Sequence, residues 1–92
     1  MRSLTLNYYQ DSGHGWVKIK RDKLIELFIE HLISSYSYQF KDNVYLEEDC
    51  DLGKLYKICD ELKIPVKLKQ YHTNKSSKIR AYDRFKSVLK GL

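Results

Sequence analysis

The sequence predicts one α+β domain spanning residues 1–92, in which a small, mostly antiparallel sheet of order ββαββαβ carries two helices on one face. Three observations predict this fold class. A chain of 92 residues is too short for two independent cores, each of which needs roughly 50 residues. Its composition, 42% hydrophobic and 32% charged, is that of a globular domain. Segments in which hydrophobic residues alternate are interleaved with segments in which they recur every three or four positions.

The first third of the chain predicts a hairpin followed by a helix. Hydrophobic and polar residues alternate over 2–9 and again over 16–20. The turn at 11–15 between them contains two glycines that can adopt positive φ. From about 22 to 33, hydrophobic residues recur at the spacings of a helix with one buried face.

A second hairpin and a second helix are predicted next. Alternating segments at 36–40 and 44–46 flank a short polar turn. Asp51 is the expected N-cap of the helix, and Pro65 predicts that the helix ends near Lys63. The buried stripe of this helix is expected to consist of Leu52, Leu55, Tyr56, Cys59 and Leu62.

The last third is predicted to contain a strand at 66–69, a polar loop at 72–78 and a short terminal helix at 83–89. These elements lie in a basic segment at 63–92, whose net charge is +8 against −3 for the rest of the chain. Its cations are interleaved with aromatic residues, a composition that suits nucleic acid and equally a basic face that is only solvated. A third reading is an acidic protein surface as the partner. The candidate contact residues of this segment are Tyr71, His72, Lys75, Lys78, Arg80, Tyr82 and Arg84.

Two other motifs offer candidate partner-binding residues. His14 lies between the glycines of the first turn, where it is either an exposed turn residue or an acid, base or ligand, and Trp16 is either core or an exposed anchor. The acidic run Glu47, Glu48 and Asp49 favours the start of the second helix. It could instead bind a hard cation, although its spacing is not that of a calcium loop, or imitate phosphates toward a basic partner.

The sequence excludes several classes of protein. Its hydrophobic stretches are far shorter than the roughly 18 residues that span a bilayer, and the first residues lack the apolar core of a signal peptide. Cys50 and Cys59 are too few for a disulfide scaffold, so we expect a cytoplasmic protein without a membrane partner. No nucleophile elbow, phosphate-binding loop or zinc-protease motif is present. We therefore expect no catalytic residues, no metal and no cofactor.

Three blocks of the chain carry a resemblance to a known group of proteins. They are DSGHGW at 11–16, SYSY at 35–38 with YLEEDCD at 45–51, and YHTN at 71–74 with IRAY at 79–82. Together they resemble a family of small proteins encoded by phages, prophages and plasmids. The resemblance implies a genetic context and no established activity. Small phage proteins of this size include inhibitors of host defence enzymes, among them anti-CRISPR proteins.

These observations lead to an expected function with two alternatives. We expect a non-catalytic protein of a mobile element that docks on a host protein or nucleoprotein complex, with counter-defence as one such role. The first alternative is direct nucleic-acid binding through the basic segment. The second is a small metal-dependent nuclease that uses His14, His72 and the acidic run.

Overall fold

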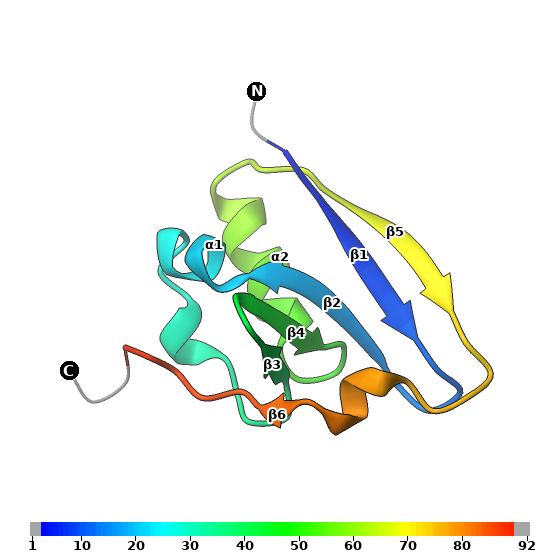
Figure 1. The fold of residues 1–92 in the computed structure, drawn as a ribbon. Coiled ribbons are helices and arrows are strands. Elements are labelled where there is room, and N and C mark those ends of the chain that lie inside the picture. The colour runs from blue at the N-terminus through cyan, green and yellow to red at the C-terminus, as the bar shows by residue number, and fades with distance from the viewer. Residues whose placement is uncertain (1–2, 90–92) are drawn as a thin grey trace.

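The computed structural model describes residues 3–89 and shows a compact α+β domain built on a six-stranded mixed sheet (Figure 1). The strands follow the spatial order β5-β1-β2-β4-β3-β6. β1 and β5 are parallel, and the other pairings are antiparallel. The strands are β1 (Leu4–Gln10), β2 (Gly15–Lys20), β3 (Tyr38–Phe40), β4 (Asn43–Glu47), β5 (Val66–His72) and β6 (Asp83–Arg84). The helices are α1 (Arg21–Glu26) and α2 (Leu52–Glu61), with 3₁₀ turns η1 (Glu30–Leu32) and η2 (Lys78–Ala81).

Both helices pack on one face of the sheet, as the sequence predicts. Alternate residues of the central strands, including Val17 and Leu46, share a buried cluster with Leu24 of α1 and Leu55 of α2. The opposite face carries a second, smaller cluster of Trp16, Tyr38, Tyr45 and Ile79. The last of these belongs to η2, so the helix-free face is partly covered by this 3₁₀ turn. No helix among residues 3–89 is long and apolar enough to cross a membrane.

The helix predicted at 22–33 is shorter than expected, because the chain leaves the helical conformation at Phe28, whose φ is 61°. The amide of Phe28 donates to the carbonyl of Ile25, and the amide of Ile29 donates to that of Leu24. This pair of bonds is the Schellman motif, which satisfies the last carbonyls of a helix and reverses the chain.

The same motif ends α2, with Lys63 at a φ of 59° and a bond from Ile64 to the carbonyl of Cys59. The prediction of a helix end near this lysine is therefore correct, and the reversal itself sets the boundary. The predicted buried stripe is only partly correct. Leu52, Leu55 and Cys59 are buried, whereas Tyr56 is 41% and Leu62 53% exposed. The tyrosine lies at the edge of the buried face, and the leucine follows the last helical residue.

The terminal helix predicted at 83–89 is wrong. The chain instead forms β6, which pairs with β3, and then continues without helix through Phe85. The amide of Phe85 donates to the carbonyl of Ser37 at 2.8 Å, and its ring is buried in the core cluster. Pairing with an open sheet edge and burying this ring outweigh the weak helical pattern of so short a segment.

Candidate functional site

A cleft forms where the first turn meets the end of the central strands. We call it the His14 cleft. Its volume is about 350 Å³. Register pairing sets Trp16 directly beside Glu47 on the helix-free face, and the first turn brings His14 over them. The lining residues are His14, Trp16, Tyr36, Tyr38, Glu47, Asp49, Cys50, Arg80 and Arg84.

Asp11 fixes the first turn to η2. Its carboxylate accepts bonds from the amides of Gly13 and His14 and two from the guanidinium of Arg80, at 2.6 and 2.9 Å. The hydrogen bond from Arg80 is the largest cause that holds the pKa of this carboxyl well below its usual range. The guanidinium also lies 5.1 Å above the ring of Trp16. Segments 69 residues apart are thereby joined at one wall of the cleft.

Glu47 is a buried carboxylate at the floor of the cleft. One oxygen, Oε1, accepts from the amides of Asp49 and Cys50 at 2.8 and 2.9 Å. The other, Oε2, lies 3.3 Å from Nδ1 of His14. Among residues 3–89, only Glu47 Oε2 and Trp16 Nε1 are buried side-chain polar atoms that make no hydrogen bond. Both belong to this cleft, which marks it as the place where the fold leaves polar groups unpaired.

The acidic run does not cap α2 in the way the sequence predicts. Asp51 occupies the N-cap position but its side chain makes no capping bond. It is instead fully buried and accepts bonds from Ser34, Ser37 and Lys54. Burial alone would raise the pKa of Asp51, but Lys54 and the serines together lower it, so the carboxylate is ionised at neutral pH. We call this group the Asp51 hub.

The other members of the run have separate surroundings. Glu48 accepts a hydrogen bond from the hydroxyl of Tyr8 on the opposite face of the sheet. Asp49 is exposed. The pKa of the Cys50 thiol is raised, first by desolvation and then by its hydrogen bond to Glu47 and the negative charge of that residue. Cys50 is thus held away from the thiolate form that nucleophilic chemistry needs.

The helix-free side of the sheet forms a second candidate surface, the basic sheet face. Side chains that alternate with the core residues point to it from every strand. Apart from Glu47 in the His14 cleft, the described strands place no carboxylate on it. One row crosses all six strands through Lys69, Asn7, Lys18, Tyr45, Tyr38 and Arg84. Near the edge of the sheet formed by β5, Tyr71 stacks on Tyr9 of β1 with the ring centroids 5.3 Å apart.

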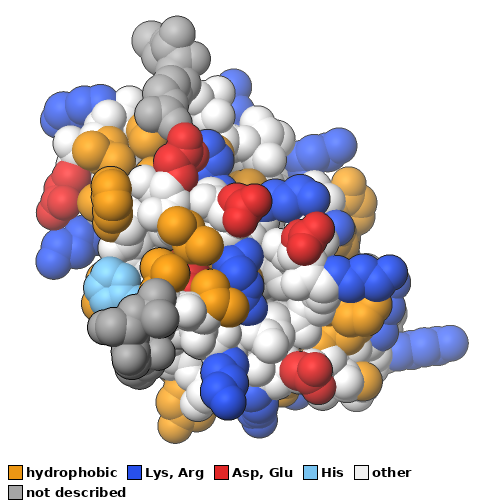
Figure 2. All heavy atoms as spheres, turned by 60° about the vertical axis from the view of Figure 1, so that its left-hand side comes forward, with side chains coloured by type: hydrophobic (Ala, Val, Ile, Leu, Met, Phe, Trp, Pro, Cys, Tyr) orange, Lys and Arg blue, Asp and Glu red, His pale blue; other side chains and the backbone are white. Residues whose placement is uncertain are grey.

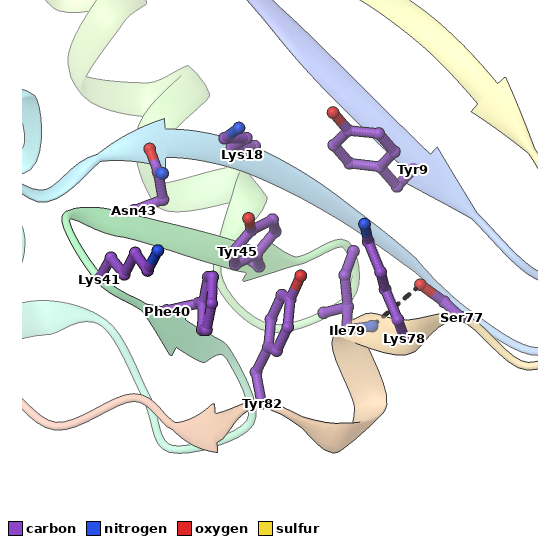
Figure 3. A pocket seen from close by; sticks show the side chains of 10 residues that line it. All are labelled: Tyr9, Lys18, Phe40, Lys41, Asn43, Tyr45, Ser77, Lys78, Ile79 and Tyr82. Atoms are coloured by element: carbon purple, nitrogen blue, oxygen red, sulfur yellow. Dashed lines mark hydrogen bonds between the residues drawn. The ribbon is translucent and has the colours of Figure 1, made fainter.

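An aromatic pocket of about 310 Å³ opens in the middle of this face (Figure 3). Tyr82 stacks on Phe40 with a centroid distance of 4.6 Å and leans on Tyr45 at 5.1 Å. Burial, followed by the neighbouring Tyr82, raises the pKa of Tyr45 to about 12, so its hydroxyl stays neutral. Three cations, Lys18, Lys41 and Lys78, line the pocket, and in the described chain none of them is in an ion pair.

The structure brings together some of the predicted site residues and separates others. His14, Trp16, Glu47, Asp49, Arg80 and Arg84 line one cleft, and Lys78 and Tyr82 line the aromatic pocket. Tyr71 lies on the basic sheet face. His72 at the end of β5 and Lys75 in the following loop are exposed and line neither cavity, and Glu48 lies on the other side of the sheet. Trp16 is 1% exposed, so it is core and not an exposed anchor.

The sequence reasoning missed half of the basic sheet face. Tyr9, Lys18, Phe40, Lys41 and Tyr45 all lie outside the basic segment at 63–92. A signal existed, because Lys18 alternates with core residues in a predicted strand and therefore had to face away from the helices.

The helix side carries an apolar surface of its own. Phe28 is 82% exposed, and Leu32 of η1 is half exposed beside a groove that α2 borders. Figure 2, which brings the side of α1 forward, shows hydrophobic side chains gathered among charged ones. Leu32 and Ile58 line this groove together with Ile29, the residue that follows Phe28. We call Phe28, Leu32 and Ile58 the helix-side patch.

The fold and its surfaces define a compact α+β domain with helices on one face of a mixed sheet and cations with aromatic rings on the other. Comparison with models of protein families, with curated proteins and with solved structures finds no match to this chain. What the protein binds is therefore inferred from its own side chains.

Proposed function

We propose that this protein is a non-catalytic binding protein that engages single-stranded nucleic acid through the basic sheet face. The observation that carries the proposal is the aromatic pocket, in which stacked rings are surrounded by three lysines that form no ion pair within residues 3–89. The cations come from three separate parts of the chain, so their convergence is a property of the fold.

The chemistry of this face suits an unpaired strand. Aromatic rings stack on bases that are free of a duplex, and lysines neutralise the phosphates between them. Tyr71 is 45% exposed and is supported from behind by Tyr9, so one ring face is held in place for a base. Holding a ring before binding reduces the entropy lost on association.

The test is binding of fluorescent single-stranded DNA and RNA of random sequence, measured by anisotropy over a range of salt concentrations. Tyr71→Ala should weaken binding about 5- to 150-fold, because a stacked base contributes roughly 1–3 kcal/mol. Tyr56→Ala is the matched control, since Tyr56 is 41% exposed on α2, away from the sheet face.

Charge is tested with a second matched pair. Lys69→Ala should reduce the slope of log affinity against log salt by about 0.7, the value for one phosphate contact on a single strand. Lys57→Ala on α2 should leave the slope unchanged. Equal effects of Lys69→Ala and Lys57→Ala, or no binding at low salt, would refute the proposal. Degradation of the oligonucleotides in magnesium or manganese would refute the absence of catalysis.

A second candidate function is docking on a host protein, and the helix-side patch favours it. A phenylalanine that is exposed and held at positive φ is costly for the isolated protein, and a partner that covers the ring would offset that cost. The resemblance to phage and plasmid proteins supplies the context, a host protein or nucleoprotein complex, with counter-defence as one outcome. A pull-down from a host lysate treated with nuclease tests it. Capture should be lost in Phe28→Asp and retained in Tyr71→Ala.

A further inference from the structure

We propose that His14, Glu47 and Asp49 form a binding site for a divalent transition-metal ion, with zinc as the best match. This inference goes beyond the proposed function and does not depend on it. The three residues each offer one ligand atom, and these atoms all lie within 4.8 Å of one another. Nδ1 of His14 lies 3.3 Å from Oε2 of Glu47.

The site rests on more than the proximity of acidic groups. The side chain of Glu47 is only 9% exposed, and its Oε2 accepts no hydrogen bond. Oε1 is already engaged by two backbone amides, so the carboxylate is held with its free oxygen toward His14. A buried carboxylate oxygen without a partner is unfavourable unless a cation or a donor satisfies it. A metal ion between Oε2 and the imidazole would do so.

The nearby cations do not occupy this position. Arg80 is committed to Asp11 through two hydrogen bonds and lies over Trp16. The guanidinium of Arg84 lies 4.8 Å from the centre of the ring of Tyr38 and donates to a backbone carbonyl. Both guanidinium groups thus have partners of their own, and neither forms an ion pair with Glu47 or Asp49 within residues 3–89. Asp49, the third ligand, is an exposed residue of the same cleft.

The ligand set selects among metals. One imidazole nitrogen with two carboxylate oxygens suits zinc, which binds both ligand types, whereas magnesium and calcium prefer oxygen alone. Three protein ligands are fewer than the four of a closed structural zinc site, which leaves a position for water or for a group of a partner. The open position would face the cleft, which Arg80 and Arg84 also line.

The experiment uses the full chain, free of nucleic acid, and zinc alone as the probe. Binding is measured by calorimetry, and cobalt is used as a second probe because it quenches tryptophan fluorescence. Trp16 is the single tryptophan of the chain, and its ring centroid lies 6.1 Å from that of His14. We expect zinc binding and cobalt quenching in the wild-type protein, and no comparable response to magnesium.

The variants assign the ligands. His14→Ala, Glu47→Gln and Asp49→Asn should each weaken zinc binding by more than about tenfold. Asp49 is exposed, so Asp49→Asn keeps the fold even if the buried Glu47→Gln does not. His72→Ala and Glu61→Gln, exposed and outside the cleft, are the controls that should bind zinc as the wild type does.

Two results would overturn the proposal. If zinc does not bind, the His14 and Glu47 side chains form an ion pair only. If Cys50→Ser abolishes binding while Asp49→Asn does not, the metal is held by the thiol and the ligand set is wrong. Neither result bears on the oligonucleotide measurements, so failure of the metal site and failure of nucleic-acid binding can be told apart.

Discussion

Replacing Asp51 by serine should destabilise the protein by about 3 kcal/mol, although serine and aspartate are equally good N-caps. The exchange separates two roles that a carboxylate at the start of α2 can have. If Asp51 only capped the helix, serine would replace it with a change near zero. The structure assigns it a different role, as the buried acceptor at the centre of the Asp51 hub.

The magnitude follows from the donors that lose their acceptor. Asp51 accepts from the amide and hydroxyl of Ser34 at 3.0 and 2.7 Å, and from the hydroxyl of Ser37 at 2.5 Å. Serine is too short to reach all of them, and each buried donor left unpaired costs about 1–3 kcal/mol. The hydroxyls can rotate toward other acceptors, which lowers the total. Lys54 is partly exposed, so its lost ion pair adds little.

The measurement is urea unfolding followed by the fluorescence of Trp16, which is buried in the native state. Asp60→Ser is the control, because Asp60 is an exposed aspartate on the same helix and should change stability by less than about 0.5 kcal/mol. The m-value should be unchanged in both variants. A loss of less than about 1 kcal/mol for Asp51→Ser would refute the hub as a determinant of stability.

Two further outcomes concern the core and pH. Leu55→Ala should cost about 2–5 kcal/mol in the same assay, whereas Tyr56→Ala should cost about 0.5 kcal/mol, because only the leucine is fully buried; equal losses would mean that α2 packs through another face. Burial alone would raise the pKa of Glu30, but bonds from Ser87, the Val88 amide and Arg21 outweigh it and lower that pKa. Its stabilisation is therefore present above the unfolded pKa of about 4.3 and is lost as pH falls toward the folded value. Glu30→Gln should flatten this acid limb in unfolding measured from about pH 5 down to about pH 2, roughly the window of that loss. An unchanged limb would refute the assignment.

The Asp51 hub and the His14 cleft use neighbouring carboxylates in opposite ways. In the hub, donors surround Asp51 completely. In the cleft, Glu47 is buried to a similar degree but keeps one oxygen without a hydrogen bond. Buried polar atoms of a native protein are nearly always paired, and this difference is the reason that the metal site is proposed for the cleft and not for the hub.

Local patterns were sufficient to predict most of the elements. The first strand, both hairpins and α2 lie within a few residues of their predicted bounds, because side-chain periodicity and turn chemistry depend on near neighbours. The alternation of Lys18 with Val17 and Ile19 also fixed which face of the sheet that lysine occupies. The shorter α1 was not predictable from periodicity, since the hydrophobic spacing continues past Phe28, where the backbone reverses.

Only the tertiary structure decided which distant segments meet. The pairing of β6 with β3 replaced a predicted helix, and the bond between Asp11 and Arg80 set the cleft against η2. The Asp51 carboxylate turned away from its own helix toward serines 14 and 17 residues earlier. These long-range contacts form because segments distant in the sequence compete for the same buried hydrogen-bond partners and sheet edges. The sequence therefore names only part of each candidate surface, because residues such as Tyr9, Phe40 and Tyr45 join the aromatic pocket through long-range packing.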